Sequence, residues 1–280
     1  MSAGRLVLVA TPIGNLGDLS PRAAATLAAA DVVACEDTRH SRKLFTSFGL
    51  RTPTLIAVHK DNEVERAREI LEMLADGKTV ALVTDAGTPA VSDPGRHVVE
   101  AAAAAGVVIE SIPGPSAVTT ALAASGFTGD RFVFEGFLPR KGSERAARLA
   151  DIARQSRTVV IYEAPTRIAK TLKELADVCG FDRAVVVGRE LTKLHEEYFR
   201  GTLAAAALRF ADNARGEFVV VIEGGSAEPL EVTDETIVAA LEQSLSAGAS
   251  TRGAADEVAD LLGVARNRAY KLAVSRRAIR

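Results

Sequence analysis

Three short apolar runs, each followed by a turn rich in glycine and proline, constrain the fold of this chain more than any other feature. Residues 6–10 lead into TPIGNLGD, residues 79–83 into TDAGTPAVSDPG, and residues 107–112 into PGPSA. Each run has the length of a strand buried on both faces, which is typical of a parallel sheet covered by helices. In open α/β sheets, ligands bind beyond the carboxyl ends of the strands. The three turns therefore predict a sizeable small-molecule site at one edge of a sheet.

The periodicity of the chain divides it into three parts. Strand and helix patterns alternate through residues 1–125, which predicts an N-terminal α/β domain. An aromatic strand over residues 132–137 begins a second alternation, so residues 126–225 are expected to form a second α/β domain. Residues 230–280 carry only helical patterns, which predicts a small C-terminal all-helical domain.

The helical tail has the spacing of a helix-turn-helix. Helices are predicted over residues 234–246, 254–262 and 265–277, and two residues separate the last two helices. No acidic residue follows Asp260, whereas six basic residues do. A nucleic-acid-binding module and a plain three-helix packing unit both fit this pattern.

Composition and charge narrow the class of protein. The 280 residues are 48% hydrophobic and 25% charged, which is ordinary for a globular protein. The longest apolar stretch, residues 98–109, is too short to span a bilayer, so we expect a cytoplasmic protein without a membrane partner. The net charge of −2 does not indicate a nucleic-acid partner, yet six basic residues lie between residues 139 and 157. Such a basic face can bind phosphates, and a solvated helix face is the alternative.

Several familiar chemistries have no motif in this chain. The P-loop pattern is absent, the first turn lacks the G-x-G-x-x-G of dinucleotide sites, and neither H-E-x-x-H nor G-x-S-x-G occurs. No cysteine or histidine pair has the spacing of zinc ligands, so no metal is expected. What remains is a crevice lined by glycine and proline, with four carboxylates at its rim, those of Glu36, Asp37, Asp85 and Asp93.

The order and spacing of the three turns resemble the tetrapyrrole methylase superfamily of S-adenosylmethionine-dependent enzymes. Four further segments, ACEDTR (34–39), FEGFLP (134–139), YEAPTR (162–167) and RELTK (189–193), are similar to its ribosomal RNA branch. That branch methylates the ribose 2′-hydroxyl of a cytidine in the decoding region of 16S ribosomal RNA. The resemblance covers residues 5–225, and the tail is similar to the domain appended in that group. The first turn departs from the G-x-G-P-G-D pattern of the tetrapyrrole-modifying relatives, which favours the RNA branch.

The resemblance implies that the two α/β domains hold S-adenosylmethionine folded in the cleft between them. Its cofactor contacts, carried onto this sequence, fall on Pro12, Ile13, Asp85, Gly87, Thr88, Ser116, Ala117, Tyr162, Glu163, Gly216 and Phe218. The cofactor is cationic, so the Asp85 carboxylate can pair with its ammonium group. Asx bonds that cap the turn are the alternative for Asp85 and Asp93, and Asp85 is the stronger ligand candidate.

Methylation of a ribose hydroxyl requires an in-line approach of oxygen to the methyl carbon, and a general base assists it. The candidates for the base are Glu36, Asp37 and His59, followed by Glu63. Arg39 could hold a neighbouring phosphate, with a salt bridge at the strand end as the alternative. The expected RNA contacts are Arg39, Lys43, Arg140, Lys141, Arg167, Arg189, Lys193, Arg266, Arg268 and Lys271.

The resemblance also implies partners, which are 16S ribosomal RNA or the 30S subunit and a second copy of the chain in a homodimer. A methylase of small tetrapyrrole-type molecules and a non-enzymatic nucleic-acid-binding protein are the alternative functions. The basic segments favour the RNA enzyme over the first alternative, because a small ligand needs no outlying basic faces. The intact cofactor turns favour it over the second.

Overall fold

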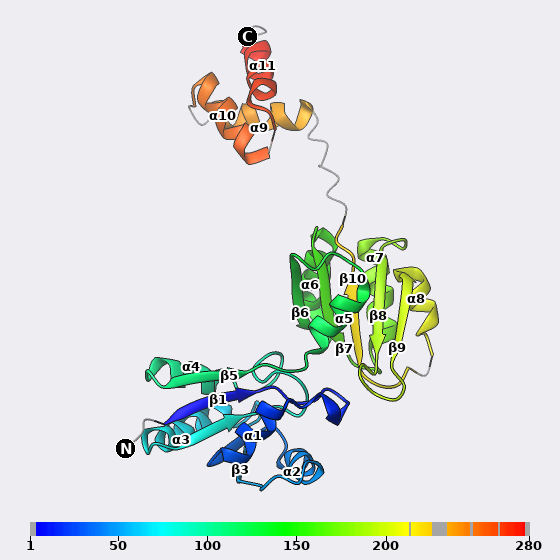
Figure 1. Cartoon of the computed structure of the whole chain (residues 1–280). Helices are drawn as coiled ribbons and strands as arrows, with labels where there is room; N and C mark the ends of the chain where they lie inside the picture. Colours follow the sequence, from blue (N-terminus) through cyan, green and yellow to red (C-terminus); the bar gives the residue numbers. More distant parts are fainter. Residues whose placement is uncertain (1–3, 213, 226–233, 247–248, 263, 278–280) are drawn as a thin grey trace. The chain divides into compact units, whose positions relative to one another are not determined.

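The computed structural model describes residues 4–212, 214–225, 234–246, 249–262 and 264–277 (Figure 1). The chain forms two compact units, residues 1–225 and residues 226–280. The first unit holds two five-stranded sheets, and the described part of the second is helical. No helix among the described residues is long and apolar enough to cross a membrane.

The first sheet is parallel, with the strand order β3-β2-β4-β1-β5. Its strands are β1 (Arg5–Val9), β2 (Val32–Cys35), β3 (Thr54–Ala57), β4 (Thr79–Leu82) and β5 (Val108–Ile112). The helices are α1 (Pro21–Ala29), α2 (Thr38–Ser47), α3 (Glu63–Ala75) and α4 (Arg96–Ala104), with a 3-10 turn over Leu16–Asp18. Because β1 lies between β4 and β5, the three glycine- and proline-rich turns leave the same edge of the sheet side by side, as the sequence predicts.

Burial on both faces explains the uninterrupted apolar composition of these strands. Leu6 and Leu82 pack with α3 and α4, whereas the neighbouring Val7 and Ala81 pack with α1 and α2. Asp37, a candidate base in the sequence, also caps a helix: its side chain accepts a hydrogen bond from the backbone N of Arg39, and α2 begins at Thr38.

The second sheet is mixed, with the order β6-β7-β10-β8-β9. Its strands are β6 (Phe132–Phe137), β7 (Thr158–Glu163), β8 (Ala184–Arg189), β9 (Glu197–Thr202) and β10 (Phe218–Ile222). Strands β6 and β7 are parallel, and β10 is antiparallel to both β7 and β8. The helices of this region are α5 (Ala117–Ser125), α6 (Gly142–Arg154), α7 (Ile168–Cys179) and α8 (Leu203–Arg209). The sequence pattern predicts neither β9 nor α8.

Alternation along β7 assigns its side chains to two cores. Val159 and Ile161 pack with α6, α7 and α8, whereas Val160 and Tyr162 lie on the opposite face, in a cluster that includes residues of α5. Helix α5, which the sequence analysis places in residues 1–125, thus packs on the second sheet. Both sheets belong to one compact unit, so the boundary between residues 125 and 126 stays a prediction.

The second unit has a core of its own. Helices α9 (Asp234–Ser246), α10 (Thr251–Leu262) and α11 (Arg266–Arg277) pack around Ile237, Leu241, Val258 and Ala269. Helix α10 begins three residues earlier than the predicted start at residue 254. The two α/β sheets and the helical tail confirm the predicted fold class.

Candidate functional site

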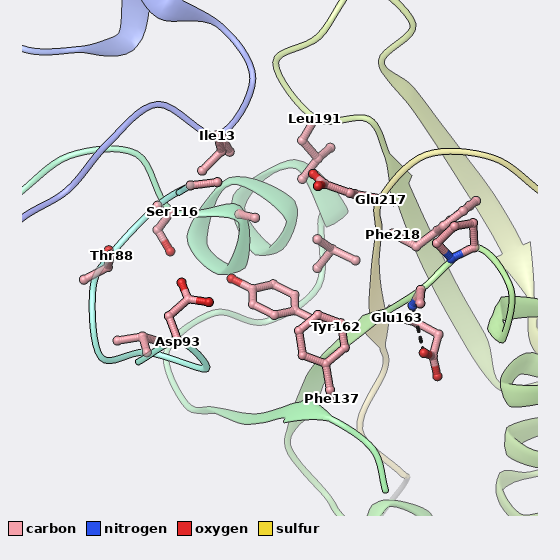
Figure 2. A pocket seen from close by; sticks show the side chains of 17 residues that line it. Ile13, Thr88, Asp93, Ser116, Phe137, Tyr162, Glu163, Leu191, Glu217 and Phe218 are labelled. Atoms are coloured by element: carbon pink, nitrogen blue, oxygen red, sulfur yellow. Dashed lines mark hydrogen bonds between the residues drawn. The ribbon is translucent and has the colours of Figure 1, made fainter. Parts of the chain in front are cut away.

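A cavity of about 300 Å³ lies where the three turns meet the second sheet (Figure 2). The loop wall, as we name the part built by the turns after β1, β4 and β5, consists of Ile13, Ala86, Gly87, Thr88, Val91, Asp93, Ser116 and Ala117. The strand wall consists of Phe137, Tyr162, Glu163, Ala164, Pro165, Leu191, Glu217, Phe218 and Val219. The volume is at the lower end of the range for small-molecule sites. The sequence prediction that the turns gather at a ligand-sized site agrees with this geometry.

Backbone hydrogen bonds join the first two turns of the loop wall. The N–H of Thr11 donates to the carbonyl of Gly87 at 2.9 Å, and the N–H of Gly87 donates back to Thr11 at 3.1 Å. The Thr11 hydroxyl also donates to the carbonyl of Thr84 at 3.0 Å. Gly87 has φ of +88°, and a Cβ there would lie 3.4 Å from the Ile13 side chain. The bend therefore requires glycine.

The second turn also holds two non-glycine residues in the left-handed region. Ala90 has φ of 66° and Ser92 has φ of 65°. Such conformations are strained for L-residues and cluster at functional sites. Val91 lies between the two residues and lines the cavity.

A bulge in β6 meets this strained segment. The register of β6 on β7 shifts between Phe134 and Gly136, and a Cβ on Gly136, whose φ is +63°, would lie 3.0 Å from the hydroxyl oxygen of Ser92. Bulges beside active sites redirect the following side chains. Phe137 follows the bulge, lines the cavity and keeps 53% of its surface exposed.

Three of the four rim carboxylates lie close to Thr84 or to one another. The Thr84 hydroxyl oxygen lies 2.8 Å from Oδ2 of Asp93 and 3.3 Å from Oε2 of Glu36. Burial raises the pKa of Asp93 to about 6, the negative charges of Glu36 and Asp85 add to the rise, and the Thr84 hydrogen bond opposes it. Among these carboxylates only Asp93 lines the cavity, although the sequence analysis ranks it below Asp85.

The candidate bases occupy different surroundings. Asp37 pairs with the Arg39 guanidinium at 2.7 Å, and its hydrogen bonds from Arg39 hold the pKa of Asp37 well below its usual range. This is the salt bridge that the sequence analysis gives as the alternative, and it makes Asp37 a poor proton acceptor. His59 is half-exposed, lies 4.0 Å from Asp61 and is outside the cavity lining. Glu63 is buried and accepts hydrogen bonds from the backbone N of Gly95 and His97, at the start of α4.

Most of the expected cofactor residues line the cavity. These are Ile13, Gly87, Thr88, Ser116, Ala117, Tyr162, Glu163 and Phe218. Pro12, Asp85 and Gly216 are not in the lining; Oδ1 of Asp85 instead accepts from the backbone N of Asp37 at 3.2 Å. The Glu163 carboxylate also points away from the cavity (Figure 2). It accepts hydrogen bonds from Thr171 and Arg167, both at 2.6 Å.

The expected RNA contacts fall into two groups. Six have acidic partners: Arg39, Arg167, Arg189, Lys193, Arg266 and Arg268. Lys43, Arg140, Lys141 and Lys271 are exposed, and within the described ranges no ion pair involves them. In the basic run of residues 139–157, Arg145 is buried against Glu174 and Arg148 pairs with Glu135. Fewer charges are therefore available to phosphates than the sequence suggests.

The amino-acid sequence matches a known family of proteins. The family model described as Tetrapyrrole (Corrin/Porphyrin) Methylases matches residues 5–207. A protein named ribosomal RNA small subunit methyltransferase I from Synechocystis is 42% identical, over 97% of this chain and 98% of its own. The protein of the same name from Thermotoga maritima is 43% identical, and 99% of it matches 79% of this chain. That relative lacks a counterpart for about a fifth of this chain.

Solved structures show the same fold. The methyltransferase CobJ covers 80% of this chain and 95% of its own, with a TM-score of 0.61 and 24% identity. Uroporphyrin-III C-methyl transferase from Thermus thermophilus, complexed with S-adenosylhomocysteine, covers 78% of this chain and 97% of its own, with a TM-score of 0.55 and 21% identity. At these identities the likeness concerns the fold alone.

Proposed function

Because the chain belongs to the tetrapyrrole methylase family, and within it to the ribosomal RNA small subunit methyltransferase I proteins, we propose that it methylates the ribose 2′-hydroxyl of a cytidine in the decoding region of 16S ribosomal RNA. S-adenosylmethionine supplies the methyl group when it is bound. The partner is 16S RNA or the 30S subunit, the protein acts in the cytoplasm, and we expect it to work as a homodimer.

The observation that carries this proposal is the two-walled cavity. Tyr162, Phe218 and the aliphatic lining suit an adenine ring, and the lack of a side chain at Gly87 leaves room for a ligand against the loop wall. The neighbouring carboxylate of Asp85 provides negative charge for a cationic cofactor. These residues fit S-adenosylmethionine without a basic phosphate cradle.

We assign the cofactor contacts to the eight expected residues that line the cavity and keep Pro12, Asp85 and Gly216 as flanking positions. Asp85 would pair with the cofactor ammonium while its Oδ1 holds the turn through Asp37. Glu36 is the preferred proton acceptor among the sequence candidates. Arg39 holds the pKa of Asp37 low, and Glu36, unlike His59, shares the Thr84 hydroxyl with Asp93 of the cavity lining. In-line positioning by the two walls would supply much of the rate.

The exposed basic residues are the proposed RNA contacts. Arg140, Lys141 and Lys43 lie on the first unit, and Lys271 lies on the tail. The paired cations Arg189, Lys193, Arg266 and Arg268 would have to exchange a carboxylate for a phosphate. An A-form RNA major groove is too narrow for a helix, so we expect the tail to contact the backbone or a junction.

The test is transfer of labelled methyl groups to small subunits and to naked small-subunit RNA, followed by nucleoside analysis. We expect 2′-O-methylcytidine. A methylated base, or transfer to a tetrapyrrole but not to RNA, would contradict the proposal. A chain ending at Gly225 tests the tail: it should bind the cofactor normally but bind RNA more weakly, with a flatter salt dependence.

A further inference from the structure

The open side of the cavity carries three residues that the cofactor assignment does not use. Val91 and Phe137 are 43% and 53% exposed although both line the cavity, so they mark its mouth. Asp93 lines the cavity beside them. Figure 2 shows the Asp93 carboxylate facing the hydroxyl end of Tyr162 and the Phe137 ring beside the same tyrosine. The ring centroids of Phe137 and Tyr162 are 5.5 Å apart.

The backbone holds these three side chains in a strained arrangement. Val91 lies between the left-handed residues Ala90 and Ser92, and Ser92 packs against the bulge that precedes Phe137. Exposed apolar side chains on strained backbone are costly and are typical of a surface that binds a ligand.

One carboxylate oxygen of Asp93 accepts a hydrogen bond within the protein, and the other can accept one from a ligand. Oδ2 accepts the Thr84 hydrogen bond at 2.8 Å, whereas Oδ1 has no hydrogen-bond partner in the described part of the chain. A carboxylate oxygen can accept from the exocyclic amino group of a base, and an exposed aromatic ring can stack on a base that has left its helix. Uracil has no such amino group, whereas cytosine has one.

We propose that Val91, Asp93 and Phe137 form a nucleobase subsite at the mouth of the cavity. Phe137 stacks on the target base, and Oδ1 of Asp93 accepts a hydrogen bond from its exocyclic amino group. This inference rests on the proposed function, which makes the base a cytosine. The cavity itself is only large enough for a cofactor-sized ligand, so the base lies at the mouth.

The first experiment uses small subunits reconstituted from transcribed RNA with cytidine, or uridine, at the position that the wild type methylates. Asp93→Asn places an amide where the carboxylate was, and an amide can accept from cytosine or donate to uracil. We expect this variant to reduce the preference for cytidine over uridine by about tenfold. The matched control, Asp212→Asn, changes an exposed carboxylate outside the cavity lining and should keep the wild-type preference.

The second experiment concerns stacking. Phe137→Ala should raise KM for the cytidine subunits by about tenfold, and Phe137→Tyr should restore it, because tyrosine keeps the ring. Phe181→Ala removes an exposed aromatic ring outside the cavity lining and serves as the control. Calorimetry should show that every variant binds S-adenosylmethionine like the wild type.

The outcomes separate this inference from the proposed function. If the wild type forms no 2′-O-methylcytidine, the proposed function fails. If the wild type is active and Asp93→Asn keeps its base preference, or loses transfer to both bases equally, the base-reading role is overturned. Weakened cofactor binding by Asp93→Asn would also overturn it, because Asp93 would then be a cofactor ligand.

Discussion

The two walls of the cavity are built in different ways. The loop wall depends on backbone geometry: a glycine at φ of +88°, two non-glycine residues in the left-handed region and hydrogen bonds between turns. The strand wall depends on side chains, with Tyr162 held by β7 and a buried carboxylate, Glu163, next to it. Changes to the loop wall should therefore act mainly on ligand binding, whereas changes beneath the strand wall should act mainly on stability.

The largest expected effect lies beneath the strand wall. Arg167→Met removes the guanidinium partner of Glu163, whose side chain is 0% exposed. An uncompensated buried carboxylate should lower the free energy of unfolding by about 3 kcal/mol, as measured by urea denaturation. Arg154→Met is the control, because Arg154 pairs with Asp151 on the surface and its side chain is 71% exposed. It should change the free energy of unfolding by less than about 0.5 kcal/mol. Equal stability of the two variants would make Arg167 a surface cation available to RNA.

The second effect tests the charge behind the loop wall. Asp85→Asn keeps an acceptor for the Asp37 backbone N–H but removes the negative charge. If Asp85 pairs with the cofactor ammonium, affinity for S-adenosylmethionine should fall by about 1.5–3 kcal/mol, measured by calorimetry. Unchanged affinity would limit Asp85 to holding the turn.

The third effect separates backbone strain from ligand binding. Gly87→Ala and Gly106→Ala both place alanine at positive φ, which should cost each variant about 1–2 kcal/mol of stability. A Cβ at Gly106 has no neighbour within 4 Å, so that variant is the matched control. Only Gly87→Ala should weaken cofactor binding. Equal cofactor binding by the two variants would show that the cofactor does not use the space left open at Gly87.

The sequence predicts the loop wall of the cavity better than the strand wall. A glycine or proline in a turn reports a backbone requirement directly, which is why the loop wall could be located from its motifs. Phe137 resembles any strand residue in the sequence, because its exposure depends on a bulge that only the register with β7 defines.

The sequence also does not show which acidic residues pair with its basic residues. Arg145 and Arg167 read as part of basic surfaces, but the fold brings Glu174 and Glu163 to them. The sequence does not separate the two roles open to Asp37, a proton acceptor or a helix cap, and only the fold shows that Asp37 caps α2.

The fourth effect is a pH dependence at the mouth of the cavity. The pKa of Asp93 in the folded protein is about 6, above its ordinary value. Burial is the main cause, the charges of Glu36 and Asp85 add to the rise, and the Thr84 hydrogen bond and the Lys60 charge oppose it. The stability that protonation provides is complete below about pH 4 and is lost as the pH rises through about 6. Asn does not titrate, so Asp93→Asn should be more stable than the wild type above about pH 7, on the order of 1 kcal/mol after allowing for partial exposure, and should lose this advantage near about pH 4. A constant difference across this range in urea denaturation would contradict the assigned burial.

The smallest effect on stability, and a clear one on binding, is expected just beyond the strand wall. Arg140 and Lys141 follow β6, are exposed and have no acidic partner among the described residues. Replacing both with serine should change the free energy of unfolding by less than about 0.5 kcal/mol. Each contact with a phosphate contributes about one to the slope of log affinity against log salt, so the slope for small-subunit RNA should fall by about two. An unchanged slope would mean that RNA reaches the cavity along another surface, because no described residue forms an ion pair with either of these two charges.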